Sequence, residues 1–198
     1  MELAQALARR RMVRRYDPDS PVADEALEQV LAAALRAPSA GFTQAVSLLV
    51  LTEPADRERF WSATAGAPSR WLDGMRTAPV LVLVLTDRDA YLDRYAQPDK
   101  GWTDRDPGRW SAPYWFVDAG MATMAALLRA VDLGLGACFF GVPVDREPAV
   151  RAAFGIPREQ LGVGVLSLGH PAPDARPSGS VMRRSRRPSA ELVHRGRW

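Results

Sequence analysis

The sequence predicts an α+β fold of an α/β-like kind, in which a central sheet is covered by helices on both faces. Short and mainly apolar segments, typical of strands buried on both sides, occur at residues 47–52, 80–86, 137–142 and 163–168. Segments with helical patterns alternate with them, and this alternation requires helices packed on a sheet. A chain of 198 residues, 47% of them hydrophobic, suits one domain that spans residues 1–198.

The first half of the chain is expected to contain four helices. Residues 2–11 form a short helix candidate. Asp24 can cap a second helix, whose apolar residues recur on one face and which Pro38 ends. Residues 54–64 and 69–76 have helical patterns between the first two strands.

The second half contains the longest predicted helix, at residues 114–133, which Gly134 is placed to stop. Its small, apolar and nearly all-round surface indicates burial between layers or between subunits. A strand at 137–142 follows, then a short helix capped by Asp145, then the last strong strand at 163–168.

Residues 88–112 differ from their surroundings because they mix Asp, Arg, Pro and Gly with aromatic side chains. A long irregular segment in a compact domain is usually functional or disordered, and its aromatic residues favour a functional lid. We therefore name residues 88–112 the lid segment. Tyr91, Tyr95 and Trp102 are its candidates for stacking on a flat substrate.

The net charge of +3 conceals a strong asymmetry. Residues 1–15 carry five arginines against one glutamate, and the tail at residues 176–198 carries seven against one. The residues between hold 14 basic and 21 acidic side chains, so an acidic body has two basic ends. Nucleic-acid binding would explain this pattern, and so would a phosphorylated ligand held between both ends.

Several classes of protein are excluded or disfavoured. The single cysteine, Cys138, rules out an internal disulfide and fits a cytoplasmic protein. The longest apolar run, 78–85, is too short to span a bilayer, and the first residues do not resemble a secretory signal. His170 and His194 are the only histidines, so we expect neither a metal site nor a Ser-His-Asp triad. A Gly-x-Gly-x-x-Gly dinucleotide motif is also absent.

Four short segments carry groups suited to a ligand with a phosphate and a planar ring. Residues 9–17 (RRRMVRRYD) offer a fork of guanidinium groups, or a solvated cationic helix end. Residues 37–44 (APSAGFTQ) expose backbone amides, or form a helix stop and a turn. Residues 134–143 (GLGACFFGVP) place a glycine at a strand end, where a planar ligand could approach the main chain. Residues 183–188 (RRSRRP) bind phosphate or form a flexible basic tail.

The order and spacing of these segments over nearly the whole chain resemble the FMN-dependent nitroreductase family. Its motifs match residues 10–16, 38–44, 134–142, 169–171 (Gly-His-Pro) and 184–188. The resemblance implies the nitroreductase fold, which is dimeric and has a mixed, mainly antiparallel central sheet.

The resemblance also implies a set of cofactor-binding residues, with no catalytic side chain assigned. Arg10, Arg184 and Arg186 match the positions that bind the FMN phosphate. Arg14 matches a base near flavin N1 and O2, where a positive charge favours the reduced ring, and the backbone near Gly141 matches the contact to flavin N5. The other cofactor-binding positions are Arg11, Met12, Pro38, Ser39, Ala40, Phe42, Gln44 and Phe140.

Two positions depart from the family pattern. Met12 stands where a serine is usual, and Phe42 where an asparagine is usual. Both departures remove polar contacts around the flavin ring, so they put typical reactivity or substrate choice in doubt.

The function implied is the transfer of electrons from NADH or NADPH to a small acceptor, such as a nitroaromatic, a quinone or an activated alkene. Donor and acceptor would visit one site in turn, by a ping-pong mechanism. The implied partners are a second copy of the chain and the small-molecule acceptor, without nucleic acid or membrane. Alternatives are a flavin-binding protein with a blocked site, for storage or sequestration, and a specialised relative such as a reductive dehalogenase or a peptide-tailoring dehydrogenase.

Overall fold

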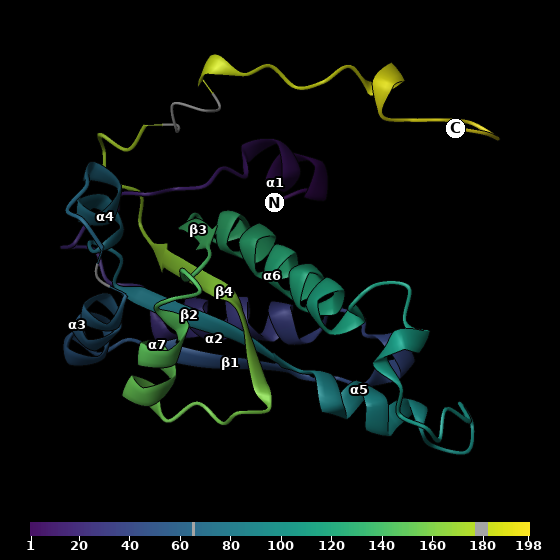
Figure 1. The fold of residues 1–198 in the computed structure, drawn as a ribbon. Helices are drawn as coiled ribbons and strands as arrows, with labels where there is room; N and C mark the ends of the chain where they lie inside the picture. The colour runs from purple at the N-terminus through teal and green to yellow at the C-terminus, as the bar shows by residue number, and fades with distance from the viewer. Residues whose placement is uncertain (65, 177–181) are drawn as a thin grey trace.

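A computed structural model describes residues 1–64, 66–176 and 182–198 of the chain (Figure 1). Within these ranges, four strands form one antiparallel sheet in the order β1-β2-β4-β3. The strands are β1 (Val46–Leu51), β2 (Val80–Asp87), β3 (Gly136–Phe140) and β4 (Gln160–Gly169). This confirms the four strands predicted from apolar runs, and a bridge between Met12 and Ala137 adds an isolated parallel contact.

One face of the sheet is covered by α2 (Asp24–Leu35) and α6 (Tyr114–Asp132). Alternate residues of a strand point to opposite faces, and Val80 and Val82 of β2 point to this one. The buried core on this side consists of Leu27, Val30, Ala34, Val80, Val82, Ala122, Ala126, Leu127, Ala130, Leu135, Ala137, Leu166 and Leu168.

The opposite face is covered by three shorter helices, α3 (Pro54–Ala63), α4 (Arg70–Met75) and α7 (Glu147–Phe154). Leu81 and Leu83 of β2 point to this side, which completes the alternation along the strand. Because both faces of β2 are buried, its uniformly apolar sequence is explained. The α+β fold with helices on both faces, predicted from the sequence, is confirmed.

The lid segment is more regular than expected. It begins with a helix, α5 (Arg88–Tyr95), because the side chain of Asp87 accepts hydrogen bonds from the amides of Asp89 and Ala90 and so caps it. A 3₁₀ turn, η2 (Pro107–Arg109), lies near its end.

Two predicted helix caps are wrong. Ala23 occupies the N-cap of α2, so that Asp24 is already the first helical residue. Arg146, and not Asp145, occupies the N-cap of α7. Neither cap uses a side-chain hydrogen bond, so the short polar residues sit beside the caps and not in them.

The two ends of the chain lie on the same side of the body. Helix α1 (Leu3–Arg9) lies beside α6, and residues 182–198 run past α1 and away from the sheet, with a 3₁₀ turn η3 (Ser189–Glu191) (Figure 1). Every residue of this last stretch is exposed. In the described parts of the chain, no helix is long and apolar enough to cross a membrane.

Candidate functional site

The arginine-rich N-terminal segment runs between β3 and α4. The amide of Val13 donates to the Ala137 carbonyl at 2.9 Å, which fixes the segment along the edge of the sheet. Two glycines make room for it. A Cβ atom on Gly136 would lie 3.0 Å from Val13, and one on Gly74 would lie 2.3 Å from the Arg14 carbonyl oxygen. The first and third of the predicted segments therefore meet in one protomer.

Tyr16 anchors the end of this segment. Its hydroxyl donates to the Val13 carbonyl at 2.7 Å and lies 2.7 Å from the Ser167 hydroxyl, while its ring is 1% exposed. A Cβ on Gly169 would lie 2.9 Å from the Tyr16 ring, so the Gly-His-Pro turn packs against this tyrosine. His170 contributes its backbone carbonyl, which accepts from the Asp17 amide. His170 thus has a structural role through its backbone.

Three arginines of the segment, Arg10, Arg11 and Arg14, have no acidic partner among the described residues, whereas Arg15 pairs with Asp174. Arg10 and Arg14 are half-buried and Arg11 is exposed. In the described part of the chain, none of the three forms an ion pair with a carboxylate. Arg14 donates from Nη1 to the Met12 carbonyl at 3.2 Å. Half-buried guanidinium groups of this kind favour an anion as their ligand.

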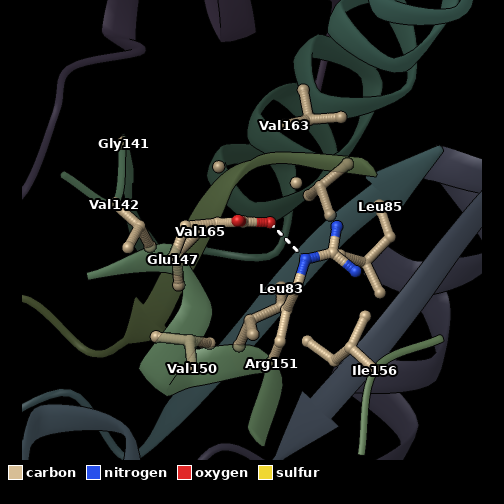
Figure 2. Close-up of a pocket in the computed structure, with 13 residues that line it drawn as sticks. Leu83, Leu85, Gly141, Val142, Glu147, Val150, Arg151, Ile156, Val163 and Val165 are labelled. Carbon is tan, nitrogen blue, oxygen red and sulfur yellow. Dashed lines mark hydrogen bonds and ion pairs between the residues drawn. The ribbon is translucent and has the colours of Figure 1, made fainter. Parts of the chain in front are cut away.

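Two hollows meet where β3 ends, at Gly141 and Val142. The first, of about 110 Å³, lies between α7 and the strands, and Figure 2 shows Glu147 and Arg151 of α7 joined by an ion pair amid the aliphatic side chains that line it. The second, of about 200 Å³, lies next to α3 and α4. A Cβ on Gly141 would meet no atom within 4 Å, so the main chain is open to a ligand there.

Aromatic side chains line the second hollow. The Phe140 ring is stacked on Trp61 with centroids 5.9 Å apart, and Trp71 meets it edge-on at 5.5 Å. Phe140 was among the predicted cofactor-binding residues, but Trp61 and Trp71 were not. The adjacent aromatic residues Phe60 and Trp61 in one helix could have indicated an aromatic site.

The loop at residues 38–44 is held in an uncommon conformation. Its 3₁₀ turn, η1 (Ala40–Phe42), contains Gly41 at φ 62°, and Phe42 and Gln44 are left-handed at φ 56° and 55°. Non-glycine residues seldom adopt this region. The Ser39 hydroxyl accepts from the Gln44 amide at 3.0 Å, and the Phe42 side chain is 76% exposed.

The register of the sheet separates this loop from the arginine segment. The loop leads into Val46, which pairs with Thr86 at the far end of β2. Ala137, beside the arginine segment, pairs with Leu168, which pairs with Val80 at the beginning of β2. Six residues of strand span roughly 20 Å, so the two sets of predicted cofactor-binding residues lie at opposite ends of the sheet in one protomer.

The tail arginines Arg184 and Arg186 are exposed, and the tail runs outside the body in Figure 1. An ion pair between Arg187 and Glu191 is internal to the tail. A phosphate clamp that combines these arginines with Arg10 therefore stays a prediction.

The lid aromatics have different surroundings. Tyr91 is 0% exposed, so the expectation that its ring stacks on a substrate does not fit its position inside the core. Tyr95 and Trp102 are partly exposed, with ring centroids 5.0 Å apart, and Trp110 packs on both. Their role in binding an acceptor stays a prediction.

Sequence reasoning also missed Asp118, a 2% exposed carboxylate in α6 that receives hydrogen bonds from Tyr91 and from Ala40. An acidic residue on the buried side of an apolar helix was the available signal. Cys138 is 1% exposed, and burial raises the pKa of its thiol. Across the described ranges, no group of three or more His, Cys, Asp or Glu residues could hold a metal ion.

Known proteins resemble this chain in sequence and in fold. The family model described as "Nitroreductase family" matches residues 7–170. An NADH dehydrogenase of Thermus thermophilus is 28% identical over 195 residues, which cover 90% of this chain and 91% of the relative. An FMN reductase of Bacillus subtilis that uses NAD(P)H is 28% identical over 171 residues, covering 86% and 66%.

A crystal structure from Desulfovibrio desulfuricans that contains FMN superposes with a TM-score of 0.71. It shares 28% of its sequence with this chain and covers 100% of it, and this chain covers 98% of that structure. Because the family model spans most of the chain, the chain belongs to the nitroreductase family.

Proposed function

We propose that this chain is an FMN-dependent oxidoreductase that passes electrons from NADH or NADPH to a small acceptor by a ping-pong mechanism. The observation that carries the proposal is the arginine segment, which lies along β3, the strand that leads to Gly141. Its half-buried guanidinium groups, those of Arg10 and Arg14, have no carboxylate partner among the described residues. Family membership and the FMN-containing relative support the same cofactor.

The residues present fit FMN. The open main chain at Gly141 admits a planar ring, and Arg10, which has no carboxylate partner among the described residues, suits a phosphate. When bound, FMN would take up electrons from the nicotinamide and deliver them to the acceptor. The protein would contribute binding and electrostatics. Arg14 would place a positive charge by the ring, the backbone near Gly141 would face the reactive edge, and Arg184 and Arg186 would complete the phosphate site.

We infer that the complete site forms between two copies of the chain. The loop at residues 38–44 and the arginine segment lie at opposite ends of one sheet, so a single protomer cannot offer both to one flavin. The first half of α6 also leaves an apolar stripe exposed. Its members are Tyr114, Val117, Met121 and Met124, with Gly120 between them. An exposed apolar helix face of this kind favours an isologous homodimer.

A flavin titration tests the cofactor. Purified chain, freed of flavin, should take up FMN to about one per chain, and anaerobic NADH or NADPH should bleach the visible flavin band, which a quinone or nitroaromatic should restore. Failure to take up FMN would end the proposal. Uptake without bleaching by either nicotinamide would identify a flavin-binding protein with a blocked site.

Mixing two inactive variants tests the shared site. An Arg10→Ala chain and a chain with Ser39 and Gln44 both replaced by Ala should each bind FMN poorly. If each site takes its arginines from one copy and its loop from the other, exchanged heterodimers regain one intact site of two, or roughly a quarter of all sites. No recovery after subunit exchange, verified by mass, would place the whole site within one protomer.

A further inference from the structure

Asp118 is a buried carboxylate whose environment offers it no positive charge. It is 2% exposed within α6, and no salt bridge to it occurs among the described residues. A buried charge without a cation is costly and persists where specific hydrogen bonds compensate for it. The partners of Asp118 should therefore reveal its role.

Both of its hydrogen-bond partners come from outside its own helix. The backbone amide of Ala40 donates to Oδ2 at 2.7 Å, and the hydroxyl of Tyr91 donates to the same oxygen at 2.7 Å. Ala40 belongs to the 38–44 loop and Tyr91 to α5, the first element of the lid segment. One oxygen atom thus joins the 38–44 loop to the lid segment.

The state of the tyrosine is consistent with this arrangement. Burial, and then the hydrogen bond and the charge of Asp118, raise the pKa of Tyr91 above its ordinary value. The hydroxyl therefore keeps its proton and remains a donor. A backbone N–H can only donate, so Oδ2 of Asp118 accepts from the Ala40 amide and from the Tyr91 hydroxyl.

The loop needs such support. Gly41, Phe42 and Gln44 all have positive φ, and a strained backbone persists where its surroundings hold it. A second tie to the lid segment exists, because Arg94 donates from Nε to the Gly41 carbonyl at 2.8 Å. The exposed Phe42 therefore lies on a loop that is hydrogen-bonded to Arg94 of α5 and to Asp118 of α6.

We propose that Asp118 is a positioning residue, which holds the 38–44 loop in its ligand-binding shape and ties that loop to the lid segment. The part of the proposal that concerns FMN rests on the function proposed above. The part that concerns the loop does not, because the two hydrogen bonds join residues of the chain itself.

Asp118→Asn is the informative substitution, since it preserves size and removes the charge. Thr123→Val is its matched control. Thr123 is buried on the same helix, and its hydroxyl donates to the Ala119 carbonyl of that helix. Among the described residues, no hydrogen bond joins Thr123 to the loop or to the lid segment. A general weakening of α6 would appear in both variants.

Two measurements on the full-length chain separate the roles. Hydrogen exchange of the Ala40 amide, without FMN, should accelerate about tenfold in Asp118→Asn, while amides inside α6 keep their protection. The dissociation constant for FMN should rise about tenfold, because only a fraction of the molecules then holds the competent loop. Thr123→Val should match the parent in both.

Parental exchange and parental FMN affinity in Asp118→Asn would overturn the proposal, and so would equal losses in Thr123→Val. Should Asp118→Asn fail to fold, Tyr91→Phe removes one donor and keeps the ring, and an Ala40 amide as protected as in the parent would then overturn it. If the parent itself does not bind FMN, the proposed function fails, whereas the exchange measurement still decides the role of Asp118.

Discussion

Replacing Gly74 by alanine would test whether the close packing of α4 against the arginine segment controls cofactor binding. Gly74 lies in α4, is buried, and faces the backbone of Arg14. An alanine at this position would normally help a helix, because alanine is favoured over glycine by about 1 kcal/mol in a helix interior. The structure predicts the opposite sign.

The new methyl group would lie 2.3 Å from the Arg14 carbonyl oxygen, well inside the roughly 3.5 Å of ordinary contact. The obstacle is backbone, so one of the two segments must shift by about 1 Å. Overpacking of this kind costs about 1–3 kcal/mol. After the helix gain is subtracted, we expect a net loss of up to about 2 kcal/mol, or a melting temperature lower by up to about 4–8 °C for this chain length.

Cofactor binding should suffer as well, because the shift displaces Arg14 and its neighbours from the ligand. Loss of one charge-assisted hydrogen bond costs about 1.5–3 kcal/mol, so the FMN dissociation constant should rise at least about tenfold in a fluorescence titration. Asp73→Ala is the control, since Asp73 is exposed on the same helix and its change should leave FMN affinity intact. A Gly74→Ala protein that melts higher than the parent and binds FMN equally well would refute this reasoning.

Arg10→Ala and Arg186→Ala should each weaken FMN by about 1.5–3 kcal/mol in a titration and barely move the flavin reduction potential; an unchanged affinity in Arg186→Ala would detach the tail from the phosphate. Arg14→Ala should lower the potential measured by spectroelectrochemistry, with a smaller loss of affinity, and an unaltered potential would contradict its place by the ring. Trp102→Ala should change the KM for aromatic acceptors more than FMN affinity, and equal steady-state kinetics with every acceptor would remove Trp102 from the site. FMN at a hundredfold excess over Kd should stabilise the chain by about 2.7 kcal/mol in thermal unfolding, and an absent shift would mean that the native state does not bind it.

Elements that depend on local pattern were predictable. The eight residues of β2 are apolar along nearly their whole length because helices cover both faces of the strand, and burial on both faces produces such runs. The length and composition of α6 likewise identify a helix that is buried along much of its surface.

Features that depend on distant partners could not be read from local pattern. Asp118 accepts hydrogen bonds from Ala40, which lies 78 positions earlier in the chain, and from Tyr91, which lies 27 positions earlier. No local sequence pattern predicts either contact. The burial of Tyr91 has the same cause, because α5 places its ring against Trp110 of the lid segment and Trp115 of α6. The helix caps failed for another reason, since a polar residue one position from the cap gives nearly the same sequence signal as one in the cap.

The separation of the two cofactor-binding sets has a thermodynamic consequence. If the arginine segment of one copy and the 38–44 loop of another hold one flavin, then FMN binds the assembled form more tightly than the separate chains. By linkage, FMN must then favour assembly by the same free energy by which assembly favours FMN. The basic ends strengthen this coupling, because they repel one another until a phosphate lies between them. FMN binding and dimerisation are thus expected to be coupled in this protein. Asp118 would support this coupling, because it positions the 38–44 loop that would contact the flavin of the partner copy.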